Sequence, residues 1–200
     1  MHSSLYFPPV AALLPALAGA PPVHVPPTAG EFFAAWMSGC GQIYIAPSPY
    51  SGLLIVLGMA CYSRISALAM LLGSLLGLTA AYMLGASSAA IGLGLWGYNP
   101  ALFMIAIFGV FFVPSPKVFC LAVTGAFLSC FLSGALATVL RPLGVPQLTF
   151  AFSCSALCFV LVQFSLADVA AVPLAQVTTP ESHWRKARVL RAVLRRLAAK

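Results

Sequence analysis

Between residues 48 and 167 the chain contains no histidine, aspartate or glutamate, and its only charged side chains are Arg64, Lys117 and Arg141. Each of the three lies at the end of an apolar run. Over the whole chain 62% of residues are hydrophobic and 6% are charged, whereas soluble domains carry roughly 25% charged residues. So few charges cannot solvate a globular surface, and the sequence predicts an all-α integral membrane protein.

The apolar region divides into segments that end at prolines, glycines or charged residues. The first, residues 31–46, is shorter than the roughly 20 helical residues that cross a bilayer core, so we expect a re-entrant half-helix there. A glycine-rich break at residues 92–97 interrupts the following segments. We therefore predict one re-entrant half-helix and five transmembrane helices, at residues 48–63, 65–85, 98–114, 117–140 and 146–167. The two short ones, 48–63 and 98–114, need help from flanking residues or a locally thinned bilayer.

The basic residues predict the orientation of these segments. Seven of the ten Lys and Arg residues follow Trp184, and a basic tail beside a span is typical of the cytoplasmic side. With five crossings, Arg64 and Lys117 also fall inside, and Arg141 falls outside. The chain is thus expected in the cell (inner or plasma) membrane with its C-terminus in the cytoplasm. Because five is an odd number of crossings, a second copy that followed in the same chain would be inserted upside down, as in inverted-repeat transporters.

Three regions are expected: an N-terminal apolar segment with a proline-rich linker (1–30), a membrane repeat (31–168) and a basic cytoplasmic tail (169–200). Residues 5–20 end in Ala18-Gly19-Ala20, which resembles a signal-peptide cleavage site. A signal peptide requires a positively charged stretch before its apolar run, however, and no Lys or Arg precedes residues 5–20. Whether residues 5–20 are cleaved or span the membrane stays open.

The tail is expected to form a helix from Pro180, because Thr179 can cap it and Glu181 favours the positive helix end. One face carries an apolar stripe and another a row of arginines: Leu190, Val193, Leu194 and Leu197, and Arg188, Arg191 and Arg195. Two interpretations stay open. The helix lies on anionic lipid as an anchor, or it is simply the positive flank of the last span.

The membrane region lacks the groups that catalysis uses. It has no carboxylate pair, no Ser/His/Asp set and no phosphate-binding loop, and proton relays use intramembrane carboxylates or histidines. Cys154 and Cys158 share a helix face, but a metal site would need more ligands, so they are interpreted as small apolar residues. We expect no enzyme, no metal, no cofactor and no nucleic-acid partner. The function that remains is passive passage of a neutral molecule across the membrane.

A few polar residues in apolar surroundings are candidates for function. Gln42 lies in the expected re-entrant segment, Tyr98 and Asn99 follow the glycine-rich break, and Thr149 begins the last span. Each could instead bond to the backbone or to a neighbouring helix. Gly73 and Gly77 form a GxxxG pattern, which predicts close helix packing within the chain or between chains.

Several short motifs, taken in order, resemble those of urea transporters. Gly94–Asn99 is similar to their GLWGFN segment, and Gly41–Tyr44 to GQV(Y/F), followed by a Pro49–Gly52 segment similar to NPxSG. Residues 145–152, VPQLTFAF, resemble the LPxxTxPF signature, and residues 177–181, VTTPE, resemble VTxPE. The ordered set covers about residues 32–182 and is most similar to the C-terminal repeat of that family.

The resemblance implies a fold of two inverted repeats, each with five spans and a re-entrant pore helix, assembled as trimers. It implies that urea, or a similar small amide, passes through a narrow pore in each protomer. It also implies six pore-lining residues: Gln42, Ile43, Ile45, Tyr98, Leu102 and Thr149. Ile45 replaces an aromatic residue of the family, Tyr98 adds a hydroxyl to the usual phenylalanine, and Ala151 replaces the proline of the signature.

The chemistry of urea fits this resemblance, because a flat, neutral and strongly hydrated molecule needs apolar walls and polar groups that replace its water. One repeat is visible in these residues, so the expected function is half of a pore. A separate chain carrying the first repeat is then the expected partner, besides the lipid bilayer and further copies of the chain. The alternative is a non-conducting truncated protein or structural subunit.

Overall fold

The computed structural model describes residues 27–165 and 169–198, and the expectations for residues 5–20 and for the linker before residue 27 lie outside these ranges. The regular elements of the described residues are helices, and a single isolated bridge pairs Phe112 with Ala171. The elements in chain order are α2 (Ala29–Gly41), η2 (Gln42–Tyr44), α3 (Pro49–Tyr62), α4 (Arg64–Met83), α5 (Ser88–Gly92), α6 (Tyr98–Ile105), η3 (Ala106–Phe111), α7 (Pro116–Leu140), η4 (Arg141–Leu143), α8 (Phe150–Val160), η5 (Leu161–Phe164), η6 (Leu174–Gln176) and α9 (Pro180–Ala198).

Two helices in the described residues are long and apolar enough to cross a membrane: α4, and α7 continued by η4. The pair Ala29–Tyr44 and Pro49–Tyr62 passes the same test together but is bent by 68°, as a broken span or a re-entrant loop would be. The predicted all-α membrane class is therefore confirmed. The number of five crossings with one re-entrant half-helix stays a prediction.

Some segments differ from the expected single helices. The segment expected at 98–114 begins as α6 and continues as the π-helix η3, whose end at Phe111 leads into the bridge between Phe112 and Ala171. Backbone bonds on both sides close that bridge, from Val113 N–H to the Ala170 carbonyl at 2.9 Å and from Val172 N–H to the Phe111 carbonyl at 2.8 Å. This long-range pairing replaces the last helical turn.

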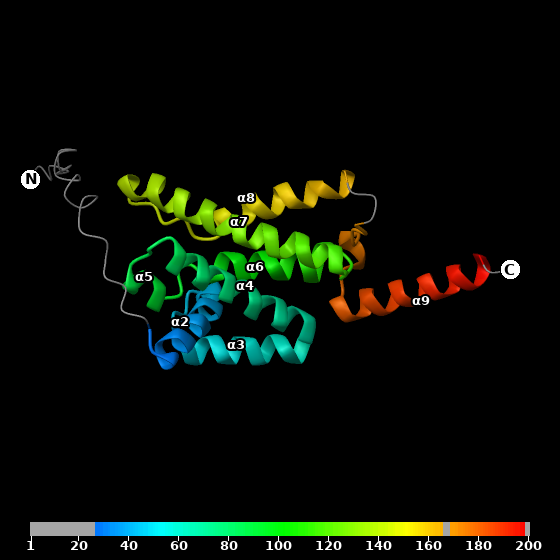
Figure 1. Ribbon diagram of the computed structural model, residues 1–200, viewed down its shortest axis with the longest axis horizontal. Coiled ribbons are helices and arrows are strands. Elements are labelled where there is room, and N and C mark those ends of the chain that lie inside the picture. The colour runs from blue at the N-terminus through cyan, green and yellow to red at the C-terminus, as the bar shows by residue number, and fades with distance from the viewer. Residues whose placement is uncertain (1–26, 166–168, 199–200) are drawn as a thin grey trace, which may run out of the picture.

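Helices α4 and α6 form the centre of the bundle, with α7 and α8 on one side and α2 and α3 on the other (Figure 1). Phe103, Met104 and Ile107 of α6 and η3 are fully buried in a core shared with α4, α7 and α8. The ring of Phe103 meets that of Phe159 edge to face at 5.1 Å between centroids, a favourable geometry for aromatic pairs. The most deeply buried helix is thus the one that begins at Tyr98.

The GxxxG pattern of α4 packs within the chain. A methyl group added at Gly77 would overlap the Trp96 carbonyl, and one added at Gly73 would overlap the Pro100 carbonyl and lie 2.6 Å from Ala101 Cα. Small residues allow two helix backbones to approach in this way. Of the two interpretations of the pattern, contact within the chain is the one found.

Glu181 at the start of α9 is bonded to the beginning of α4 rather than to its own helix end alone. Ser63 Oγ donates to the Glu181 carboxylate at 3.0 and 2.9 Å, and Ile65 N–H donates to it at 2.9 Å. Burial raises the pKa of the Glu181 carboxyl, but bonds from the Ile65, Glu181 and Arg64 backbone and from Ser63 outweigh burial and hold that pKa below its usual value of 4.5. A carboxylate at a helix N-terminus is also favoured by the helix dipole.

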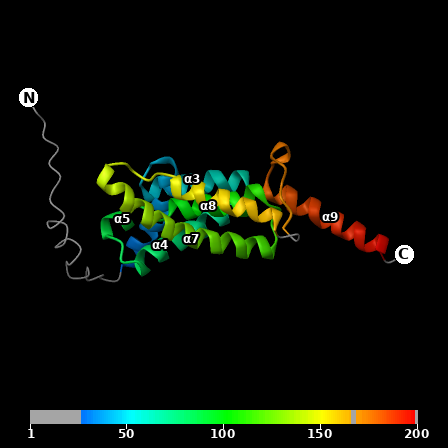
Figure 2. The same cartoon turned by 90° about the horizontal axis from the view of Figure 1, so that it is seen from above.

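From this attachment α9 runs outward along the long direction of the bundle (Figure 1, Figure 2). The helix from Pro180 is confirmed, and its apolar side chains Val189, Leu190, Leu194 and Leu197 are 55–64% exposed. The two interpretations of this helix, a lipid anchor and the positive flank of the last span, both stay predictions.

We predict that Gly77→Ala destabilises the α4–α6 contact, because the added methyl group meets a backbone carbonyl that cannot rotate away. Overpacking of this kind costs about 1–3 kcal/mol. Gly58→Ala is the matched control, since nothing lies within 4 Å of a methyl group there. The measurement is the temperature at which the purified protein in detergent loses its monodisperse size-exclusion peak. Equal temperatures for both variants would contradict the packing argument.

We predict that the contact between Glu181 and α4 weakens in acid. Because the folded-state pKa of Glu181 is lowered, the stability it contributes is present above pH 4.5 and is lost as the pH falls through the folded-state pKa. The melting temperature of Glu181→Gln should therefore lie below that of the unchanged chain at pH 7, with the difference shrinking towards pH 4. A difference independent of pH would show that the carboxylate charge is not involved.

Candidate functional site

The end of α2 and the start of α6 touch through small residues. A methyl group on Gly97 would lie 2.9 Å from Gly39 Cα and 2.7 Å from Ser74 Oγ, and one on Gly94 would overlap the Gly39 amide. Gly94 has a φ of +70°, a conformation that a side chain would strain. The glycines of the Gly94–Asn99 motif therefore bring Tyr98 close to the residues that follow α2.

Those residues form a tight turn. Gln42–Tyr44 is one 3-10 turn, closed by a bond from Ile45 N–H to the Gln42 carbonyl at 3.0 Å, and Ile45 has a φ of 58°. A β-branched residue in this left-handed region is strained. The turn leaves Ile45 77% exposed and Gln42 half-buried.

Tyr98 and Asn99 hold the loop before α8. The Tyr98 hydroxyl donates to the Leu148 carbonyl at 2.6 Å, and the Asn99 amide donates to the same carbonyl at 3.2 Å. Asn99 Oδ1 accepts from Phe152 N–H at 3.3 Å, one of the first N–H groups of α8, which have no partner inside their own helix. Leu148 has a φ of 43°, so these bonds hold a strained loop in place.

These three parts surround one cavity of about 680 Å³. It is lined by Gln42, Ile43, Ile45, Tyr98 and Thr149, which are five of the six expected pore residues. Leu102, the sixth, does not line this cavity and lies half-buried on α6. The convergence of residues far apart in the sequence agrees with the expected site, and their role in a pore stays a prediction.

Several lining residues were not expected from the sequence. Ser133 and Thr138 come from α7, Arg141 follows that helix, and Gln147 lies in the loop before α8. Gln147 lies two residues before Thr149 in the segment that resembles LPxxTxPF, so this motif could have identified it as a candidate lining residue. Ser133 is one of many serines in apolar helices, and nothing in the pattern distinguishes it.

The cavity is lined mostly by uncharged residues. Arg141 is the one charged side chain among its lining residues in the described part of the chain, and neither a carboxylate nor a histidine is among them. Nor do the described residues contain a group of three or more His, Cys, Asp or Glu side chains that could hold a metal ion. The neutral amides and hydroxyls can hydrogen-bond a neutral polar solute, but they do not form a catalytic set.

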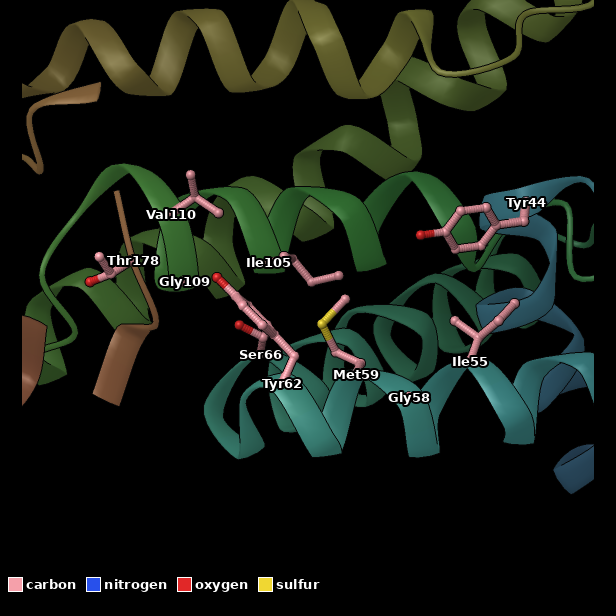
Figure 3. A pocket seen from close by; sticks show the side chains of 10 residues that line it. All are labelled: Tyr44, Ile55, Gly58, Met59, Tyr62, Ser66, Ile105, Gly109, Val110 and Thr178. Atoms are coloured by element: carbon pink, nitrogen blue, oxygen red, sulfur yellow. The ribbon is translucent and has the colours of Figure 1, made fainter. Parts of the chain in front are cut away.

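A second cavity of about 580 Å³ lies between α3 and the α6–η3 segment. Figure 3 shows Met59 and Ile105 pointing toward one another across it, with Tyr44 at one end and Thr178 at the other. Gly58, Gly109 and Val110 add to its apolar lining. Because Tyr44 lines this cavity and Gln42 the other, the turn at residues 42–44 contributes to both cavities.

The fold is that of a helical membrane protein, and its cavity is lined by amide, hydroxyl and apolar side chains and by Arg141. A protein-family model described as urea transporter matches residues 4–164. The chain belongs to the urea transporter family.

Curated relatives agree with this assignment. The chain is 32% identical over 145 residues to urea transporter 1 of Ovis aries, and 30% identical over the same length to urea transporter 1 of Mus musculus and of Rattus norvegicus. Each match covers 72% of this chain and 38% of the relative. The chain thus spans well under half the length of these relatives.

We predict that Asn99→Leu destabilises the protein more than Tyr98→Phe does. Asn99 is 1% exposed, and its replacement leaves Phe152 N–H without a partner, which costs about 1–3 kcal/mol. In Tyr98→Phe the Leu148 carbonyl keeps its bond from Asn99, so the loss is about 1 kcal/mol. Melting temperatures in detergent and faster hydrogen exchange at the Phe152 amide are the measurements. Equal effects, or slow exchange retained in Asn99→Leu, would contradict this role of Asn99.

Proposed function

We propose that this chain forms half of the wall of a channel through which urea, or a similar small neutral amide, moves passively down its gradient. The observation that carries the proposal is the convergence of Gln42, Tyr98 and Thr149 on one cavity in a member of the urea transporter family. Gln42, Ile43, Ile45, Tyr98, Leu102 and Thr149 are the proposed pore-lining residues.

The proposed mechanism is replacement of water. Moving a polar amide out of water without new hydrogen bonds costs several kcal/mol, so the solute needs partners along its path. The Gln42 amide can both donate and accept, and the Thr149 hydroxyl can do the same. Ile43, Ile45 and the Tyr98 ring supply apolar surface that excludes ions. Because some groups supply hydrogen bonds and others supply apolar walls, a flat, neutral solute can pass without being bound tightly.

A second, inverted repeat is the proposed partner, either on another chain or elsewhere in a longer one. The rim of the cavity carries apolar side chains that are open in the described chain: Ile45 is 77% exposed, Leu148 56% and Leu95 36%. An inverted copy packed against this rim would cover these side chains and complete the wall of the cavity. Assembly of completed pores into trimers, as in the family, is part of the same proposal.

We further propose five crossings with one re-entrant half-helix, in the cell (inner or plasma) membrane, and with a cytoplasmic C-terminus. The starts of α4, α7 and α9 lie at one end of the bundle, and the end of α7 lies at the other (Figure 1). Arg141 then falls at the second end, whereas Arg64, Lys117 and the start of the basic tail fall at the first. This asymmetry supports placing the first end in the cytoplasm.

We predict that Gln42→Leu weakens urea binding roughly twofold to tenfold, which corresponds to one hydrogen bond of about 0.5–1.5 kcal/mol. Binding is measured with isotope-labelled urea by NMR on the purified chain in nanodiscs, because binding does not require a completed pore. Gln176→Leu is the matched control, since Gln176 is exposed in η6 and does not line the cavity. Unchanged binding in Gln42→Leu would remove Gln42 from the proposed pore, and no binding by the unchanged chain would overturn the proposed function.

The orientation gives a separate prediction. In a chain whose own cysteines are replaced, single cysteines at Arg141 and at Arg195 should react with an impermeant maleimide from opposite sides of the membrane. The residue at 141 should react in intact cells, and the residue at 195 only after the cells are opened. Labelling of both from the same side would refute the proposed number of crossings.

A further inference from the structure

Three buried side-chain oxygens, all on residues that line the cavity, have no hydrogen-bond partner in the described part of the chain. They are Gln42 Oε1, Ser133 Oγ and Gln147 Oε1. They come from three separate elements, namely the η2 turn, helix α7 and the loop before α8. Buried polar atoms are normally paired, and these three are the buried unpaired side-chain N and O atoms found among the described residues. Their gathering in one cavity points to a ligand.

Ser133 differs from the hydroxyls around it. Ser129 Oγ donates to the Ala126 carbonyl at 2.7 Å, Thr138 Oγ1 to the Gly134 carbonyl at 2.9 Å, and Ser155 Oγ to the Ala151 carbonyl at 2.8 Å. This bond to the preceding turn is the usual way in which a helical hydroxyl is satisfied. Ser133 is 3% exposed and has no such bond. Its hydroxyl therefore remains available to the cavity for both donating and accepting.

Gln147 is held by its backbone while its side-chain oxygen is unpaired. The Gln147 carbonyl accepts from Phe150 N–H at 3.0 Å, and the carbonyl of the next residue is held by Tyr98 and Asn99. Gln147, which lines the cavity, is therefore carried by a loop that is fixed at two points. A preorganised acceptor of this kind loses little freedom when a solute binds.

We propose that Ser133 and Gln147 determine the solute specificity of this cavity. Together with Gln42 they accept hydrogen bonds from the N–H groups of a passing amide, so the cavity favours solutes rich in N–H groups over their N-alkylated relatives. The inference rests on the proposed function, and it adds Ser133, which lies outside the family motifs, and Gln147, which occupies a variable position of one of them. A site built to hydrogen-bond N–H groups disfavours analogues that lack them, because its acceptors are then left unpaired.

The test compares urea with N,N′-dimethylurea, which has half as many N–H groups. Binding of each is measured by NMR on the full chain in nanodiscs, for the unchanged chain and for Ser133→Ala, Gln147→Leu and Gln42→Leu. Ser129→Ala is the control for the serine and Gln176→Leu the control for the glutamine, because neither residue lines the cavity. Melting temperature is recorded for every variant.

We expect Ser133→Ala and Gln147→Leu each to weaken urea binding roughly twofold to tenfold, as for one lost hydrogen bond. Both should lower the ratio of urea to dimethylurea affinity. Ser133→Ala should keep its melting temperature, because the hydroxyl it removes is unpaired, whereas Ser129→Ala should lose stability without losing urea.

An unchanged ratio in both variants, with urea binding still weakened in Gln42→Leu, would overturn this inference and leave the proposed function standing, since the two oxygens would then be only hydrated. Failure of the unchanged chain to bind urea would overturn both.

Discussion

The lipid core offers no water to backbone groups, so every interruption of a helix inside it must be covered by protein. Besides residues 84–87, three helix interruptions of the described chain contribute residues to the cavity: residues 45–48, 93–97 and 144–149. Short backbone bonds close the first two, from Ile45 N–H to the Gln42 carbonyl and from Gly97 N–H to the Gly94 carbonyl. Tyr98 and Asn99 close the third through the Leu148 carbonyl. Polar side chains and irregular backbone therefore coincide around this cavity.

The Gly94–Asn99 motif accounts for much of this arrangement, and its glycines and its polar residues have different roles. Gly94 and Gly97 have no side chain to separate α6 from Gly39 of α2, and Tyr98 and Asn99 bind the loop before α8. The hydroxyl that Tyr98 adds to the family's phenylalanine thus has a structural partner rather than only a place in the cavity. The motif joins three helices, and its Leu95, Trp96 and Tyr98 line the cavity.

The sequence was informative where the signal is local. Runs of apolar residues between prolines and charges located α3, α4 and α7 closely, and the motifs identified Gln42, Tyr98 and Thr149, which the fold brings to one cavity. It was not informative where a distant partner decides the outcome. The π-helical end of the α6 segment depends on a bridge to Ala171, and the unpaired state of Ser133 depends on what α7 faces. Neither leaves a periodicity in the chain, and Leu102 shows that one turn along a helix can lead out of a cavity.

The bond between Glu181 and the start of α4 also has a consequence for the order of synthesis. Ser63 and Glu181 are separated by 118 positions, which a ribosome adding about 5–20 residues per second needs about 6 to 24 s to cover. During that interval α4 has already been made, and its first N–H groups lack the carboxylate that later accepts from them. Ser63, whose hydroxyl accepts from Ser66 N–H at 3.0 Å, can protect the helix start in the meantime. The nascent α4 therefore begins with a neutral local cap and acquires its charged one only when the tail emerges.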